Sequence, residues 1–179
     1  MWHDEMTSMP KLRTYVTFKS LLEPEKYLSC VYPAKFRISL SKFRCASHKY
    51  NIETGRHNNI PEAERLCNFC ISQNIEYIEN EYHFLAICPQ YQELRNRFLP
   101  PWFIDNPTYN KFVSLLCTTN TFYLNQLANY VYHAMKCRDW LIHFTAMYNF
   151  HLFLYSHSVL RNIYFCVLYA LWAYGLLRK

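Results

Sequence analysis

Four residues in the middle of the chain have the types and the spacing of ligands to a single metal ion. Cys67, Cys70, His83 and Cys88 follow the pattern C-x2-C-x12-H-x4-C. Thiolates and imidazoles are ligands that Zn²⁺ prefers, and two cysteines separated by two residues can bind one ion from a single tight turn. The second pair lies about one helical turn apart, after a spacer long enough for the chain to reverse once. The spacing therefore predicts a tetrahedral zinc site.

The ligand set also predicts what the metal does. Three sulfur ligands and one nitrogen ligand complete a tetrahedron and leave no position for a catalytic water, so we expect a structural zinc that folds the segment around it. His48 and His57 are alternative ligands, but the cysteine-rich quartet is already complete. The remaining central and C-terminal histidines have no partner at ligand spacing and are interpreted as helix-surface or core residues: His133, His143, His151 and His157.

The composition of the 179-residue chain bounds its class. This length suits one ordinary domain, or a small domain with appendages. Eight cysteines would suit a secreted disulfide scaffold, yet the N-terminus has no apolar segment typical of a secretory signal. We therefore expect a cytoplasmic or nuclear protein that is not secreted. In a reducing compartment the other cysteines are predicted to be small buried hydrophobic residues: Cys30, Cys45, Cys117, Cys137 and Cys166.

Glycine is rare, with two in the whole chain, which favours helices over hairpins. We expect a short helix near residues 24–30 and an amphipathic helix over about residues 34–48. Weak alternation in the second segment leaves a strand as the alternative, and its length favours the helix. The following run, 51–59, has the composition of a turn, with Gly55 as its left-handed position.

The second half of the chain is also predicted to be helical. A helix is expected from Pro89 to about Phe98, another after Pro107, and a long amphipathic one from Thr121 to Arg138. Residues 139–179 form an apolar tail with eleven aromatic residues after position 139. Arg161 separates two uncharged stretches of this tail. The second, 163–177, is shorter than the roughly 20 residues that a helical membrane span needs, and the first contains His143, Asn149, His151, His157 and two serines, so a span stays an alternative.

The sequence thus predicts a mainly α-helical fold with a zinc-stapled CCHC knuckle, a possible short hairpin in that knuckle, and an aromatic tail. Four segments are expected. They are a basic helical segment 1–60, the knuckle 61–98, a helical segment 99–138 and the tail 139–179.

Several strings around the quartet resemble the C-terminal region of proteins encoded by invertebrate non-long-terminal-repeat (LINE-type) retrotransposons. The resemblance covers about residues 10–138 and is strongest from 36 to 98. The matching strings are R-x3-H of Arg44 and His48, IETGR of 52–56, ERLC of 64–67, EYHF of 81–84 and CPxYxxLR of 88–95.

The resemblance implies a zinc-knuckle-like module that assists the handling of RNA or DNA beside the polymerase module of the parent element. Catalysis is not expected in this chain. Reverse transcription uses paired aspartates that hold two metal ions, whereas Asp4, Asp105 and Asp139 are isolated from one another. Clustered carboxylates of a nuclease are equally lacking, because Glu76, Glu79 and Glu81 have no evident partner base and are interpreted as a solvated face.

Charge indicates which surface would contact a nucleic acid. Residues 1–60 have a net charge of +5, residues 61–94 of −5 and residues 95–179 of +6. Three thiolates on Zn²⁺ make the acidic segment more negative by about one unit, which repels phosphates. The contact is therefore expected on the preceding basic segment, with Tyr50 available to stack on a base: Lys35, Arg37, Lys42, Arg44, His48, Lys49, Arg56 and His57. A merely solvated basic face is the alternative, as are a zinc-stabilised protein-interaction module and a small membrane-associated protein.

Overall fold

The computed structural model describes the backbone of residues 2–154 and the side chains of residues 4–142. Contacts between residues divide the chain into two units, Met1–Cys137 and Arg138–Lys179. Most of the predicted tail 139–179, including Cys166, lies outside the described residues. None of the described helices has a stretch long and apolar enough to cross a membrane.

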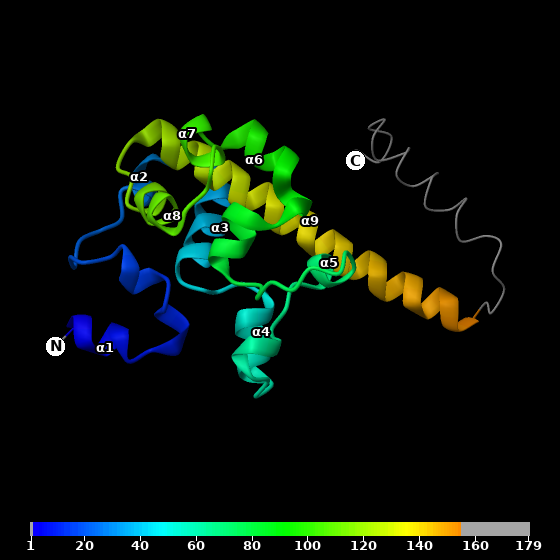
Figure 1. The fold of residues 1–179 in the computed structure, drawn as a ribbon. Coiled ribbons are helices and arrows are strands. Elements are labelled where there is room, and N and C mark those ends of the chain that lie inside the picture. Colours follow the sequence, from blue (N-terminus) through cyan, green and yellow to red (C-terminus); the bar gives the residue numbers. More distant parts are fainter. Residues whose placement is uncertain (1, 155–179) are drawn as a thin grey trace. The chain divides into compact units, whose positions relative to one another are not determined.

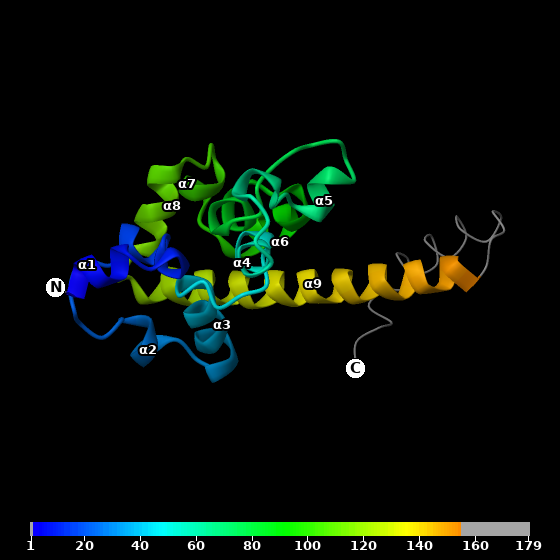
Figure 2. The ribbon, with the colours of Figure 1, turned by 90° about the horizontal axis from the view of Figure 1, so that it is seen from below.

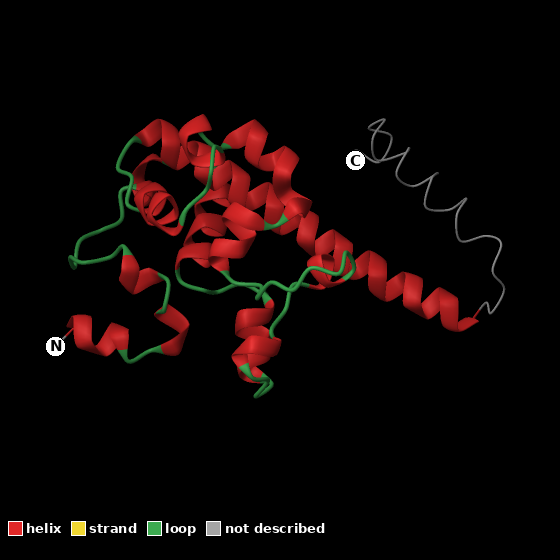
Figure 3. Ribbon diagram, viewed as in Figure 1, coloured by secondary structure: helices red, strands yellow, loops and turns green. Residues whose placement is uncertain are grey.

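The described residues are mainly helical, as the sequence predicts (Figure 3). The helices before the metal-binding segment are α1 (Trp2–Thr7), α2 (Tyr27–Cys30), α3 (Ala34–Arg44) and α4 (Asn51–His57), with the 3₁₀ turns η1 (Pro10–Leu12), η2 (Tyr15–Thr17) and η3 (Glu62–Glu64). The helices that follow are α5 (Asn68–Ile71), the π-helix η4 (His83–Ile87), the 3₁₀ turn η5 (Pro89–Tyr91), α6 (Gln92–Phe98), α7 (Pro101–Ile104), α8 (Tyr109–Leu116) and α9 (Thr121–Leu154). Among the described residues, one isolated antiparallel β-bridge, Leu66 with Ile78, lies where the hairpin was expected.

Helix α3 is shorter than the predicted 34–48 because the chain turns away after Arg44. The amide of Cys45 still bonds to the Ser41 carbonyl, and Ala46 then adopts a left-handed conformation with φ of 48°. Leu40 and Phe43 are fully buried, so the predicted apolar stripe of this helix is confirmed.

Helix α4 corrects one sequence-based expectation. Residues 51–57 were expected to form a turn around a left-handed Gly55, but they form a helix in which Gly55 is buried and is not left-handed. The left-handed residue is Asn59, which follows the helix with φ of 54°. The prediction of a turn was wrong because Gly55, in a short polar segment, was interpreted as a turn residue, whereas it lies inside a helix.

The first half of α9 is the element on which much of the unit Met1–Cys137 packs. Figure 1 and Figure 2 show α3 and α6 beside it. One face of α9 is buried at the spacing that the sequence predicts, while Phe36 of α3 and Phe98 of α6 contact rings on a neighbouring face. The buried residues of this face are Leu124, Leu127, Ala128, Val131 and Ala134.

Candidate metal centre

The four predicted ligands converge on one point in the interior. Cys67, Cys70, His83 and Cys88 are all buried, and their ligand atoms lie within 4.8 Å of one another. The Sγ of Cys88 is 3.9 Å from that of Cys67 and 4.0 Å from that of Cys70, whose Sγ is 3.5 Å from Nε2 of His83. The metal-ligand spacing in the sequence is thus realised as a compact Cys₃His cluster.

These separations suit a tetrahedral ion. Zinc bonds of about 2.3 Å to sulfur and 2.1 Å to nitrogen place two sulfur ligands about 3.8 Å apart and a sulfur and a nitrogen ligand about 3.6 Å apart. The three measured separations lie within a few tenths of an ångström of those values. The cluster can therefore hold a metal ion with small movements of its side chains.

A tight turn positions the first pair of ligands. Cys67 stands at the start of α5, its amide donates to the Tyr77 carbonyl (2.7 Å), and the adjacent Leu66–Ile78 bridge holds the two sides of the segment together. The Cys70 carbonyl accepts the Ile75 amide at 3.0 Å, so the chain folds back directly after the second cysteine. Cys67 and Cys70 then face the same point.

A π-helix positions the second pair. In an α-helix residues five apart point about 140° from each other, which would separate His83 from Cys88. In η4 the Cys88 amide instead donates to the His83 carbonyl at 2.8 Å, the i to i+5 bond of a wider turn. The H-x4-C spacing is thereby brought to one face.

Three side chains outside the ligand pattern stabilise this π-helix. Asn80 accepts the His83 amide at 2.8 Å, the buried Arg95 donates to the Cys88 carbonyl at 2.6 Å, and the Tyr130 hydroxyl donates to the Phe84 carbonyl at 2.8 Å. Sequence reasoning missed these roles. The matched string CPxYxxLR contains Arg95 and was the only signal available for it.

The pKa values of the three cysteines indicate how many of them are thiolates when no metal ion is bound. Hydrogen bonds from Cys88 and His83 lower the pKa of Cys67 to about 3. Burial, and then the Cys67 charge, raise the pKa of Cys70 to about 11. Donation to Cys67, together with burial, raises the pKa of Cys88 as well. One thiolate is thus stable alone, and three thiolates at this distance need a cation among them.

The imidazole of His83 is oriented by packing. The ring of Tyr77 stacks on it with centroids 5.2 Å apart, and Tyr77 itself is exposed. Nδ1 of His83 is buried and has no hydrogen-bond partner among the described residues, so within this part of the chain the ring is oriented by stacking and not by a polar group.

Part of the predicted basic contact surface is buried. Arg44 is 4% exposed and donates to the Leu116 carbonyl and to Glu25. The side chain of His48 is 2% exposed and bonds to Glu81, while Tyr50 is stacked between His48 and Phe84. The prediction that Arg44, His48 and Tyr50 face a nucleic acid was therefore wrong. The sequence did not reveal their burial because the residues that cover and pair with them are distant in the chain.

The other predicted contact residues are accessible. Lys35, Lys42, Lys49 and His57 are exposed, and Arg37 and Arg56 are half-buried. Arg56 forms an ion pair with Glu53. The predicted surface therefore consists of fewer free cations than the sequence suggests.

The expected acidic face is also partly wrong. Glu76 is exposed, but Glu79 and Glu81 are buried. Glu81 accepts hydrogen bonds from Arg13 and Thr14, and Glu79 accepts the Asn51 amide at 2.7 Å. These carboxylates connect the metal-binding segment to the preceding part of the chain.

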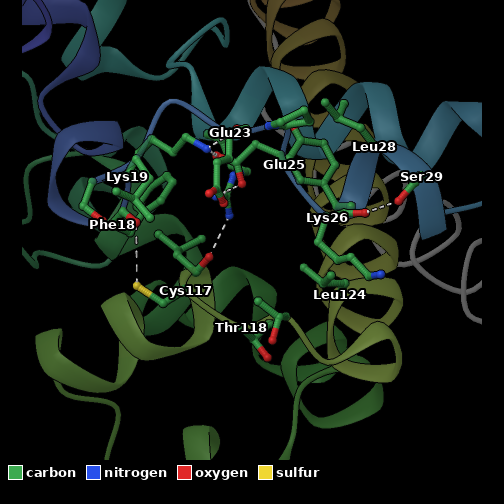
Figure 4. A pocket seen from close by; sticks show the side chains of 17 residues that line it. Phe18, Lys19, Glu23, Glu25, Lys26, Leu28, Ser29, Cys117, Thr118 and Leu124 are labelled. Carbon is green, nitrogen blue, oxygen red and sulfur yellow. Dashed lines mark hydrogen bonds and ion pairs between the residues drawn. The ribbon is translucent and has the colours of Figure 1, made fainter. Parts of the chain in front are cut away.

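Cysteines outside the cluster are less buried than predicted. Cys30, Cys45 and Cys137 are half-buried, and Cys117 is exposed. Cys117 belongs to a cavity of about 650 Å³ between residues 18–29 and the C-terminal end of α8 (Figure 4). Glu25 pairs there with both Lys19 and Arg44. No metal-site residue lines this cavity.

Comparisons of the chain with models of protein families, with curated proteins and with solved structures find no match.

Proposed function

We propose that this chain is a zinc-stapled, non-catalytic module that binds RNA or DNA, derived from the C-terminal region of a LINE-type retrotransposon protein. The buried Cys₃His cluster is the single observation that carries the proposal. Four protein ligands occupy a tetrahedron and leave no open coordination position, so the ion acts on the fold. The resemblance of the matched strings supports the origin.

Zinc is proposed as the ion because three thiolates and one imidazole are a soft ligand set without carboxylates. Its binding stabilises the segment that also holds α6 and α9 through Arg95 and Tyr130. Accessible cations in a chain with a net charge of +6 support a polyanionic partner.

Elemental analysis and a binding assay on the full chain test the proposal together. We expect one zinc per chain, and binding to a fluorescein-labelled 20-nucleotide strand that weakens steeply between 50 and 200 mM salt. Cys67→Ser should lose both zinc and binding, because the cluster no longer closes. Cys117→Ser removes an exposed thiol outside the cluster and should keep both.

Two results would count against parts of the proposal separately. A metal-free chain with unchanged helical content would show that no ion staples the fold. A zinc-loaded chain that binds no nucleic acid at 50 mM salt would contradict nucleic-acid binding but not the structural role of zinc.

One observation favours a protein-interaction module as the second candidate. Leu22 is 76% exposed, and Tyr32 and Ile38 are more than half exposed. Sedimentation velocity of the zinc-loaded chain would reveal self-association. The double variant Leu22→Ser/Ile38→Ser should abolish it.

A further inference from the structure

A second surface of the unit Met1–Cys137 combines aromatic rings with free cations. It lies where α3 and α6 both approach α9, and Figure 1 and Figure 2 show these two helices beside α9. Rings of α3 and α6 contact rings of α9 there. We name it the aromatic–basic surface, and it consists of Lys35, Phe36, Arg97, Phe98, Tyr132, His133 and Lys136.

The rings of this surface form a continuous row. Phe98 and His133 are stacked, with centroids 5.3 Å apart and planes 5° apart. The Tyr132 ring lies 5.2 Å from that of His133 and 5.1 Å from that of Phe36. His133 is exposed and the other three rings are half-buried, so part of the row remains accessible to a ligand.

Two cations of the surface lie over these rings, and a third lies beside them. The Lys35 ammonium is 5.1 Å from the centroids of both Phe36 and Tyr132, and the Arg97 guanidinium is 5.2 Å from that of Phe98. Lys136 is exposed one helical turn after Tyr132 and His133, on the same face of α9. Among the described residues, none of Lys35, Arg97 and Lys136 forms an ion pair, whereas Arg13, Arg44 and Arg56 all do.

His133 lies near two of the positive charges of this surface, those of Arg97 and Lys35. Burial lowers the pKa of this residue, and the nearby charges of Arg97 and Lys35 lower it further. His133 is therefore a neutral, flat ring at neutral pH, and the nearby Arg97 and Lys35 have no ion-pair partner in the part of the chain that the structure describes. Such a ring offers a π-face to a base while the cations offer charge to phosphates.

We propose that the aromatic–basic surface binds single-stranded nucleic acid, with bases stacked on the His133–Tyr132 row and phosphates paired with Lys35, Arg97 and Lys136. Base faces are accessible only in unpaired strands, whereas a duplex presents edges and backbone. This inference rests on the proposed nucleic-acid function. It keeps Lys35 from the predicted contact surface and moves the rest of the contact to α6 and α9.

The metal centre supports this surface directly. Arg95, two residues before Arg97 on α6, donates to the carbonyl of the ligand Cys88. Tyr130, two residues before Tyr132 on α9, donates to the carbonyl that follows the ligand His83. The ion thus fixes the two helices that contribute most of the rings and cations.

The test compares two charge-matched variants of the zinc-loaded chain by fluorescence anisotropy. The probe is a mixed-sequence 20-nucleotide strand, alone or annealed to its complement. Arg97→Ala/Lys136→Ala should weaken single-strand binding at least tenfold and reduce the salt slope by about 1.4, since each phosphate contact contributes about 0.7. Lys11→Ala/Lys26→Ala removes two exposed cations outside this surface and should change affinity less than threefold.

A second pair of variants isolates stacking from charge. His133→Ala should weaken single-strand binding about fivefold or more without changing the salt slope, and His133→Phe should restore it because the ring is kept. Zinc content and helical signal of each variant confirm that its fold is intact.

The outcomes separate this inference from the proposed function. If the wild-type chain binds neither probe, the nucleic-acid function itself is wrong. If it binds but prefers the duplex, or if Arg97→Ala/Lys136→Ala binds as well as wild type, the contact lies elsewhere and only this inference is overturned. Equal competition by polyglutamate would overturn it in favour of an acidic protein partner.

Discussion

Gly55 sets how closely helix α4 approaches the start of the metal-binding segment. A Cβ at this position would lie 2.6 Å from Cγ and 2.9 Å from Cδ of Arg65. Arg65 cannot easily move, because its guanidinium donates to the carbonyls of Ile52 and Ile60. The glycine is therefore required for a close contact between two segments and not for an unusual backbone conformation.

Gly55→Ala should consequently destabilise the protein, although alanine is the better helix former. We expect a net loss of about 1–2 kcal/mol, since overpacking costs about 1–3 kcal/mol and helix propensity returns up to about 1 kcal/mol. Chemical denaturation of the zinc-loaded chain measures this loss. In an Arg65→Ala background the same substitution should be neutral or stabilising, and an unchanged penalty there would refute the contact as its cause.

The role of a single residue could be predicted from the sequence only where its partners lie nearby in the chain. The Cys₃His cluster was predicted because Cys67 and Cys88 belong to one short pattern. Burial of Arg44 and Glu81 was not, because Arg44 bonds to a carbonyl 72 residues away and Glu81 to Arg13, 68 residues away. A local pattern shows a charge and its neighbours but not a distant partner, so these residues were read as exposed.

At the scale of elements, the π-helix η4 has a carbonyl that its own helix cannot satisfy. The Cys88 amide is used by the His83 carbonyl, and Pro89 has no amide hydrogen to offer to Phe84. The Tyr130 hydroxyl of α9 fills this gap. The sequence predicted a helix at the position of α9 but neither the π-helix at 83–87 nor this contact, because H-x4-C gives no sign that its turn is wider than an α-turn.

Tyr130→Phe should therefore weaken the metal-binding arm as well as the fold. We expect a loss of about 1–3 kcal/mol, the cost of leaving a buried carbonyl unpaired, and faster release of zinc to a chelator. Denaturation and a chelator-competition time course measure the two effects. Tyr132→Phe is the matched control, since no hydrogen bond of its hydroxyl is present among the described residues; equal effects of the two variants would contradict this role of Tyr130.

At the scale of the whole molecule, a partly buried ionic network connects Arg13, near the N-terminus, to the metal-binding segment. Arg13 pairs with both Glu53 of α4 and Glu81, and Glu53 also pairs with Arg56. Burial alone would raise the pKa of Glu53, but the hydrogen bonds and charges of Arg56 and Arg13 lower it below its usual value. The basic segment 1–60 and the acidic segment 61–98 are thereby joined by an ion pair between Arg13 and Glu81.

The sign of this shift predicts an acid-sensitive fold. A carboxylate with a lowered pKa in the folded state contributes stability above its unfolded pKa of about 4.3, and this contribution is lost as the pH falls through the folded value. Glu53→Gln should lower stability at pH 7 by about 1.5–3 kcal/mol and lower it less at pH 3. Thermal unfolding at both pH values tests this expectation. Glu76→Gln, at an exposed carboxylate, should change neither, and parallel acid profiles for Glu53→Gln and wild type would contradict the assignment.

The order of the ligands along the chain has a consequence for biosynthesis. All four candidate ligands lie between residues 67 and 88, whereas the side chains that hold the π-helix from outside, Arg95 and Tyr130, come later. Closing so short a segment around an ion costs little chain entropy, so the cluster can form once Cys88 has left the ribosome. The helices α6 and α9 then dock, as they emerge, on a centre that is already in place.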